Sequence, residues 1–234
     1  MKRSYEKEMM DLPGNHPEVL AGDLRNLRRL NRYLSGSRSV VLALRRALRR
    51  EPLKQFSVLD VGTGSADIPA AISAWAKRCN IAARIVGLEV ESITARIAAH
   101  QNQQRADVTI IQGDAGAPPF LSGSFDFVVA SQFLHHFSEE RIVDLLKQWA
   151  KLARRGIILS DLVRHPVAYH GIRLLTKVTT RNLMTLVDAP LSVRRAFTIH
   201  EWRELLRQAD VGRVEMFSVF PFRVAAAVRL GGEG

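Results

Sequence analysis

Two glycines and an acid at the end of one apolar run are the residues best suited to hold a ligand. The run 58–61 contains Asp60 and leads into Gly62, Thr63 and Gly64, after which a helix-like segment follows. Glycine at 62 and 64 lets the backbone turn sharply and leaves no side chain between it and a bound molecule. Because the pair lies between an expected strand and an expected helix, it fits a ligand-binding loop better than an ordinary turn.

The charges around this loop favour a cationic ligand over a dinucleotide. A dinucleotide loop has a third glycine where this chain has Asp67, and Asp60 precedes the first glycine by two residues. These carboxylates would repel a pyrophosphate at the helix start. S-adenosylmethionine has no phosphate, and its sulfonium and ammonium groups are positive. The sequence therefore predicts S-adenosylmethionine as cofactor and S-adenosylhomocysteine as its product.

Two further acids follow the next two apolar runs. Glu89 ends the run 84–89, and its carboxylate can accept both hydrogen bonds of a ribose diol. Asp114 follows the run 108–112, where a carboxylate can accept a hydrogen bond from the adenine amine. The alternatives are a solvated acid at 89 and a plain Gly-Asp turn at 113–114. Acids that end successive parallel strands share one edge of the sheet, which is where open α/β sheets bind ligands.

The elements that must position these residues alternate along the chain. Apolar runs without polar alternation indicate strands buried on both faces, with helices between them. We predict a doubly wound, mostly parallel α/β sheet that ends in an antiparallel pair, because only three residues separate the last two runs. The expected strands are 56–61, 84–89, 108–112, 125–130, 156–161, 213–219 and 223–230, and the expected helices between them are 66–78, 93–103, 139–152 and 198–208. Thr198 and Glu201 are predicted to form a capping box.

Two regions outside this alternation are predicted to be helical and to cover the site. Leu24, Leu27, Leu30 and Leu34 recur at helical spacing between arginines, and a second helical pattern covers 40–50. We divide the chain into an N-terminal helical lid segment, 1–52, and a domain, 53–234, in which the helical insertion 165–192 lies over the acceptor site.

These motifs resemble those of class I S-adenosylmethionine-dependent methyltransferases. The resemblance covers about 56–230, includes Phe-Asp-Phe-Val-Val at 125–129 and Phe-Leu-His-His-Phe at 133–137, and is greatest to the ubiquinone/menaquinone-biosynthesis and small-molecule group. It implies a Rossmann-like, seven-stranded sheet of order 3-2-1-4-5-7-6. The usual turn before the fifth strand is replaced by Ala-Arg-Arg-Gly at 153–156, where we still expect a turn.

The resemblance also assigns roles to residues. The first loop is expected to hold the methionine moiety, Glu89 the ribose, Asp114 with Ala115 the adenine, and Ser131 with Gln132 the region of the reacting methyl. The complete predicted cofactor set is Asp60, Gly62, Thr63, Gly64, Glu89, Val90, Asp114, Ala115, Ser131 and Gln132.

Three histidines are candidate general bases, because imidazole titrates near neutral pH. His136 follows the fourth strand, and the alternative is that it packs under the cofactor and fixes the loop. His165 and His170 lie in the insertion, where a surface histidine is the alternative. We predict no metal, since His165, His170 and His200 lack metal-ligand spacing with nearby acids.

The bulk composition sets the remaining expectations. The 234 residues carry a formal net charge of +11 and one cysteine, Cys79, which excludes an intramolecular disulfide and suits a cytoplasmic protein. The favoured function is O- or C-methylation of a small, aromatic, polyketide- or quinone-like acceptor. Two other functions stay open: an RNA or protein methyltransferase, and a non-catalytic cofactor-binding protein. A homodimer also stays open, as does a peripheral membrane contact through the Leu-Arg helix, which is the predicted helix of Leu24, Leu27, Leu30 and Leu34.

Overall fold

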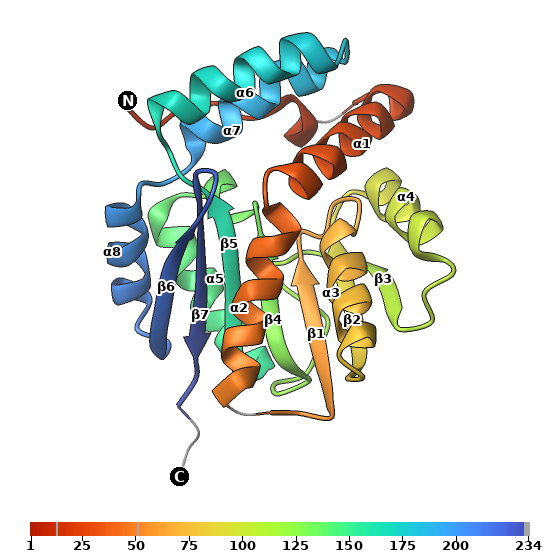
Figure 1. Cartoon of the computed structure of the whole chain (residues 1–234), viewed down its shortest axis with the longest axis vertical. Coiled ribbons are helices and arrows are strands. Elements are labelled where there is room, and N and C mark those ends of the chain that lie inside the picture. The colour runs from red at the N-terminus through yellow and green to blue at the C-terminus, as the bar shows by residue number, and fades with distance from the viewer. Residues whose placement is uncertain (13, 51, 232–234) are drawn as a thin grey trace.

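The computed structural model describes residues 1–12, 14–50 and 52–231, and its centre is a seven-stranded sheet (Figure 1). The strand order is β3-β2-β1-β4-β5-β7-β6, and only β7 runs antiparallel to its neighbours. The strands are β1 (Gln55–Val61), β2 (Ala82–Glu89), β3 (Val108–Gln112), β4 (Phe125–Ser131), β5 (Ala153–Leu162), β6 (Arg213–Val219) and β7 (Arg223–Arg229). The predicted fold class and strand order are confirmed.

Helices cover both faces of this sheet and its carboxyl edge. In Figure 1, α2 and α3 lie in front of the sheet, α5 and α8 lie behind it, and α1, α6 and α7 lie above the carboxyl ends of the parallel strands. The helices are α1 (Pro17–Tyr33), α2 (Gly36–Arg50), α3 (Asp67–Arg78), α4 (Ser92–Asn102), α5 (Glu139–Leu152), α6 (Pro166–Thr179), α7 (Leu183–Arg195) and α8 (Ile199–Ala209), with 3-10 turns η1 (Met9–Asp11) and η2 (Leu134–His136).

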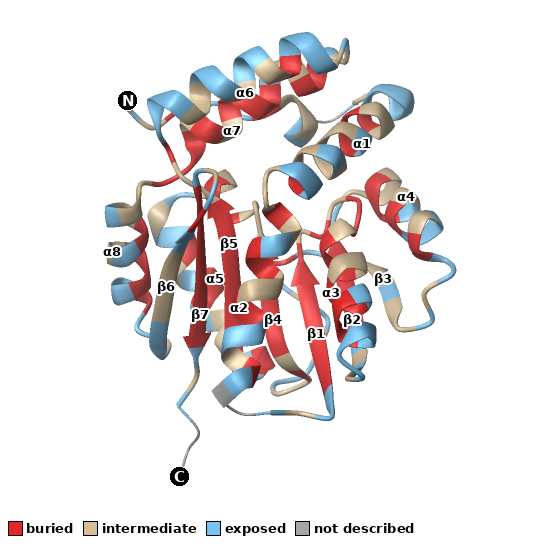
Figure 2. Cartoon of the chain, in the orientation of Figure 1, coloured by how far each residue is buried: buried red, intermediate tan, exposed pale blue. Residues whose placement is uncertain are grey.

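The central strand β1 shows why its run has no polar alternation. Leu59 and Val61 belong to the core between the sheet and α5 and α8, whereas Phe56 and Val58 belong to the core beneath α2 and α3. Successive side chains of a strand point to opposite faces, so both sets must be apolar when helices cover both faces. Figure 2 accordingly shows β1, β4, β5 and β7 as mostly buried.

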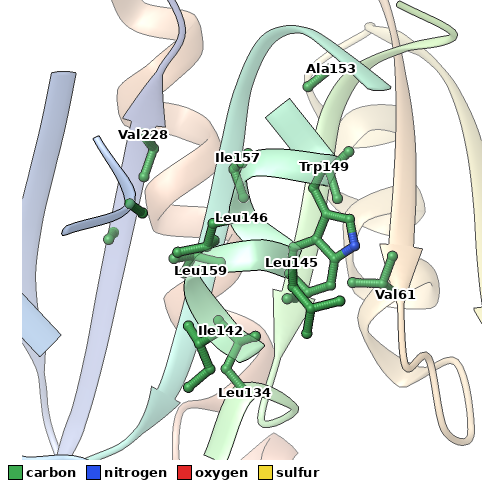
Figure 3. Close-up of a cluster of buried hydrophobic side chains, with 14 of the residues drawn as sticks. Val61, Leu134, Ile142, Leu145, Leu146, Trp149, Ala153, Ile157, Leu159 and Val228 are labelled. Atoms are coloured by element: carbon green, nitrogen blue, oxygen red, sulfur yellow. The ribbon is translucent and has the colours of Figure 1, made fainter. Parts of the chain in front are cut away.

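The core behind the sheet also supports the loops at the carboxyl edge. Trp149 of α5 is fully buried and packs among Val61, Leu145 and Ile157 (Figure 3). Its indole nitrogen donates a hydrogen bond of 2.9 Å to the carbonyl of Ala115, in the loop after β3. The packing of α5 therefore fixes a loop that was predicted to contact the cofactor.

Most predicted elements are confirmed within two or three residues, and three details differ. α1 begins at Pro17, seven residues before the first periodic leucine, and the insertion forms two helices of which α7 extends to Arg195. The expected turn at 153–156 is wrong, because β5 begins directly after α5. Arg154 and Arg155 there lie 3.1 and 3.4 Å from a carboxylate oxygen of Asp126 on the neighbouring strand, which holds this segment in the sheet. No helix among the described residues has the length and apolarity needed to cross a membrane.

Candidate active site

A cavity of about 740 Å³ lies between the carboxyl edge of the sheet and the helices above it. Its floor comes from the loops after β1, β2, β3 and β4, and its upper walls come from α1, α6, α7 and the first residues of the chain. All ten predicted cofactor residues line it: Asp60, Gly62, Thr63, Gly64, Glu89, Val90, Asp114, Ala115, Ser131 and Gln132. The fold thus gathers into one cavity residues that are spread over 73 positions of the sequence.

The two glycines of the first loop serve different purposes. Both have positive φ, +63° at Gly62 and +53° at Gly64, which favours glycine. A Cβ at Gly62 would lie 2.1 Å from the ring of Phe133, so this backbone packs tightly against η2. A Cβ at Gly64 would meet no atom within 4 Å. Gly62 is therefore required by packing, whereas Gly64 keeps the cavity floor open.

Three carboxylates meet beside this loop, of which Asp60 and Glu89 are buried and Asp67 is half-buried. Asp60 accepts a hydrogen bond of 2.6 Å from the Thr63 hydroxyl, yet burial, with the nearby Asp67 and Glu89, raises its pKa to about 8. Burial also raises the pKa of Asp67 and of Glu89 above their usual values. A positive ligand would offset this crowding, because an opposite charge favours the ionised form of each acid.

Glu89 also holds the first loop in place. Its two carboxylate oxygens accept hydrogen bonds from the Gly64 amide at 2.9 Å and from the Glu91 amide at 3.1 Å. Asp114 and Val90 lie at the exposed edge of the cavity, where Asp114 accepts from the Gly116 amide at 2.7 Å. The acid at β2 is thus part of the floor, and the acid after β3 is part of its rim.

The loop after β4 provides polar atoms on the opposite side of the floor. The Ser131 hydroxyl is buried and has no hydrogen-bond partner within the described part of the chain. Gln132 has a φ of +52°, and its side chain bonds to Asn31 of α1 and accepts from Arg223 of β7 at 3.1 Å. Asn31 and Arg223 were missed in the sequence, since neither lies in a motif. An unpaired buried hydroxyl facing a cavity fits a polar ligand.

The adjacent histidines after β4 have different environments. Both line the cavity, but His135 is buried with its Nδ1 2.7 Å from Asp161, whereas His136 is half-buried with its Nδ1 2.8 Å from Asp11. Burial alone would lower the pKa of His135, but Asp161 and Glu8 raise it to about 10. His135 is therefore a cation at neutral pH, and His136 is the more exposed of the two rings.

The first twelve residues, here called the N-terminal strap, form part of the cavity wall. Glu8 is buried, accepts from the Ser192 hydroxyl at 2.9 Å and lies 3.5 Å from Nε2 of His135. The Met9 and Met10 amides donate to the Asp188 carboxylate of α7 at 2.8 and 3.0 Å. Sequence reasoning missed Glu8 and Asp11, because nothing near them in the sequence connects them with the histidines.

Glu8, His135 and His136 are also the residues that could hold a metal. One potential ligand atom of each lies within 4.8 Å of the others. The carboxylates on both Nδ1 atoms would orient the rings for such a role. A metal would require Nε2 of His135 without its proton, whereas the charged ring pairs with Glu8 instead. The prediction of no metal did not consider this group.

The other two candidate bases lie outside the cavity wall. His165 caps the start of α6, where its ring accepts a hydrogen bond of 3.2 Å from the Val167 amide and stacks on Phe222 with centroids 5.0 Å apart. His170 is exposed on α6 next to Tyr169. Neither appears in the cavity lining. The structure thus brings His136 to the site and leaves His165 and His170 out of it.

The upper part of the cavity is apolar. Leu24, Leu27 and Leu30 of the Leu-Arg helix, which is α1, line this part. α6 contributes Ile172 and Leu175, and α7 contributes Val193. The wall therefore changes from acidic and polar at the sheet edge to aliphatic beneath α1 and α6. Polar and charged side chains reach the same cavity from the N-terminal residues, from the loop after β4 and from α7: Lys7, Glu8, Asp11, His136, Asp188, Ser192 and Arg195.

Comparisons with known proteins agree with this geometry. Residues 58–156 match the family model described as a methyltransferase domain. A search of curated protein sequences found no significant match.

Solved structures share the fold at low sequence identity. A SAM-dependent methyltransferase from Aquifex aeolicus aligns with a TM-score of 0.62 at 16% identity, covering 93% of this chain and all of that one. Magnesium protoporphyrin IX methyltransferase from Synechocystis PCC 6803 aligns with a TM-score of 0.57 at 16% identity, covering 95% and 91%. The YcgJ protein of Bacillus subtilis aligns with a TM-score of 0.53 at 20% identity, covering 77% and 70%. The chain therefore contains a methyltransferase domain at 58–156 and has the class I fold that it shares with the S-adenosylmethionine-dependent methyltransferase of Aquifex aeolicus.

Proposed function

We propose that the protein methylates oxygen or carbon of a small, aromatic, polyketide- or quinone-like acceptor. The observation that carries this proposal is the single cavity that leads from the acidic floor to the apolar space beneath α1 and α6. Its volume of about 740 Å³ lies in the upper part of the range of about 300–1,000 Å³ for ligand pockets, which suits a cofactor together with a small acceptor. The similar Synechocystis enzyme is named for a porphyrin, which is a large, flat and mostly apolar acceptor.

The floor is assigned to the cofactor. Asp60 with the loop 62–64 would hold the methionine moiety, Glu89 the ribose, and Asp114 with Ala115 the adenine. Asp60, Asp67 and Glu89 have raised pKa values, and a sulfonium or ammonium bound beside them would favour their ionised forms. The Ser131 hydroxyl, which has no hydrogen-bond partner among the described residues, would bond the part of the cofactor nearest the acceptor.

The upper space is assigned to the acceptor. Its aliphatic walls exclude water and align an apolar ring or chain with the floor, and such alignment accounts for much of the acceleration in a displacement between two bound groups. When bound, S-adenosylmethionine supplies an electrophilic methyl group. An acceptor hydroxyl or acidic C–H that faces His136 would lose its proton to that ring, because Asp11 orients the imidazole through Nδ1.

The other two histidines have no part in this proposal, since His165 and His170 lie outside the cavity lining. The covered acceptor space also favours a small acceptor over RNA or a folded protein. Arg28, expected on the basic face of α1, donates instead to the Ser65 carbonyl at 2.7 Å beneath that helix. The His136–Asp11 pair favours catalysis over a binding role alone.

Isothermal titration with S-adenosylmethionine and S-adenosylhomocysteine, with NAD as control, tests the cofactor assignment. We expect micromolar affinity for the first two and none for NAD. A screen of phenols and quinones with labelled S-adenosylmethionine then tests the acceptor class. Tight binding of NAD, or methylation of RNA with no transfer to any phenol or quinone, would overturn the proposal.

The role of His136 needs a measurement of its own. His136→Gln and Asp11→Asn should each lower kcat by roughly 10²-fold or more while the cofactor dissociation constant stays within about twofold, because a positioned base contributes about 10²–10⁴-fold. Asp11→Glu, which keeps the charge, should recover part of the rate. An unchanged kcat in both variants would show that His136 only packs beneath the ligands.

A further inference from the structure

The hairpin of α6 and α7 has an unusual charge pattern. Residues 162–187 contain no aspartate or glutamate, but they include four basic residues, Arg164, Arg173, Lys177 and Arg181. In Figure 1 this hairpin lies at one end of the molecule, beyond the carboxyl edge of the sheet. Arg164 is buried and paired with Glu201, so the positive charge that faces solvent comes from Arg173, Lys177 and Arg181.

α6 is apolar on two of its sides. Ala168, Ile172 and Leu175 line the cavity. Leu174 and Val178 point elsewhere and are 66% and 72% exposed. At 100° per residue these two lie close to the direction of Val167, which is exposed and also lines the cavity. The exposed apolar stripe therefore runs along the rim of the cavity.

The corner between α6 and α7 extends this surface. Leu183 at the start of α7 is 62% exposed, and Lys177 and Arg181 are exposed beside it. Arg25 and Arg29 of α1 line one small depression together with Glu18 and residues of this corner, so two positive charges and one negative charge lie beside it. Figure 2 shows the outer side of α6 as exposed along most of its length.

We propose that this face docks on an anionic lipid surface. The docking face is defined as Leu174, Val178 and Leu183 with Lys177, Arg181, Arg25 and Arg29. Large aliphatic side chains next to arginine and lysine are the composition of helices that lie in a membrane interface. Basic residues are attracted to anionic headgroups by roughly 1 kcal/mol each, and the whole chain carries a net charge of +11.

A second copy of the chain fits this face less well. A two-fold contact would bring the same surface against itself. Lys177 and Arg181 would then face the basic residues of the partner, and the 162–187 segment has no carboxylate to pair with them. A lipid surface supplies both the missing negative charge and an apolar layer. Docking would also place the cavity rim at the layer from which an apolar acceptor could enter.

Vesicle sedimentation tests the proposal with the whole protein and needs neither cofactor nor acceptor. We expect binding to vesicles of phosphatidylcholine with phosphatidylglycerol, little binding to phosphatidylcholine alone, and weakening with added salt. The paired variant Lys177→Glu and Arg181→Glu should reduce the partition coefficient by roughly tenfold or more. Leu174→Ser with Val178→Ser should also reduce it.

Matched controls separate this face from general effects of charge and apolarity. Lys147→Glu with Lys151→Glu on α5, and Leu121→Ser, alter exposed residues outside the docking face and should leave binding within about twofold. Equal losses in control and test variants would overturn the proposal. So would the absence of vesicle binding, or a concentration-dependent dimer in sedimentation velocity that Leu174→Ser with Val178→Ser abolishes.

Discussion

The floor of the cavity and its roof are built in opposite ways. The roof is defined here as the upper walls, which come from α1, α6, α7 and the N-terminal strap. The floor consists of short loops that each follow one strand, and its contacts join residues of neighbouring loops, such as Gly64 and Glu89. The roof joins distant parts of the chain, as where the Met9 amide bonds to Asp188. The floor depends on backbone conformation and on a few acids, whereas the roof depends on buried charges that meet only in the folded chain. We infer that the fold fixes the cofactor end and leaves the acceptor end free to differ.

The largest expected effect comes from Gly62 in the floor, which packs against Phe133 in the loop after β4. Gly62→Ala places a Cβ 2.1 Å from Phe133 at a positive φ, so it should destabilise the protein by about 2–5 kcal/mol. Gly64→Ala meets no atom within 4 Å and should cost only about 1–2 kcal/mol for its φ. Urea denaturation measures both.

Cofactor titration separates the two glycines further. Gly64→Ala should fold and yet bind S-adenosylmethionine more weakly, because its methyl group would occupy open space in the floor. Equal stability of the two variants would contradict the distinction between a packing glycine and an open one.

The roof should respond to pH through His135. Its pKa in the folded protein is about 10, above the usual 6.5, so folding takes up a proton. The stabilisation is therefore complete below about pH 6.5 and is lost as the pH rises through about 10. His135→Gln should lower the free energy of unfolding by about 3 kcal/mol at pH 6, because it removes the cation that pairs with both Asp161 and Glu8.

Urea denaturation at several pH values between 6 and about 10 checks this sign. The difference between wild type and His135→Gln should shrink toward the upper end of the range, and the exposed His200→Gln should track the wild type throughout. A difference that grows with pH would mean that His135 is neutral in the folded protein.

Much of the floor could be predicted from the sequence because its determinants are local. The Gly62 loop, Glu89 and Asp114 each follow an apolar run, and the rule that parallel strands share a carboxyl edge brings them together without knowledge of side-chain contacts. The seven strands are confirmed for the same reason, whereas their order, also confirmed, was implied by the family resemblance. The 153–156 turn was wrong because Asp126, which holds that segment, lies on another strand.

The roof could not be predicted in this way. Glu8 meets His135 across 127 positions, and Asn31 meets Arg223 across 192, with no spacing rule to connect them. The helical character of α6 was visible, but which of its sides faces the cavity was not. His165 and His170 were placed by their position in the insertion, and the helix turns both away from the cavity lining. Long-range ion pairs carry no local signature in a single sequence.

A smaller effect is expected from Glu89 in the floor. Glu89→Gln keeps the shape of the side chain and removes the charge that accepts from the Gly64 and Glu91 amides. Cofactor affinity should fall by about 10–100-fold, the range for a hydrogen-bonded charge. Asp114→Asn is the matched variant at the exposed rim and should cost less than about tenfold. An equal loss at both positions would contradict the division into a buried floor and a solvated rim.

The smallest effect should come from a feature that belongs to neither floor nor roof. Thr198 and Glu201 form the predicted capping box of α8, in which the Glu201 amide donates to the Thr198 hydroxyl at 3.2 Å and the Thr198 amide to the Glu201 carboxylate at 2.7 Å. Thr198→Ala should lower the free energy of unfolding by about 1 kcal/mol, and Thr198→Ser should restore most of it. Thr198 does not line the cavity, so cofactor affinity and acceptor turnover should stay at their wild-type values in both variants. A change in turnover would mean that α8 is coupled to the roof, through the Glu201–Arg164 pair and the bond from Arg164 to the Met1 carbonyl in the N-terminal strap.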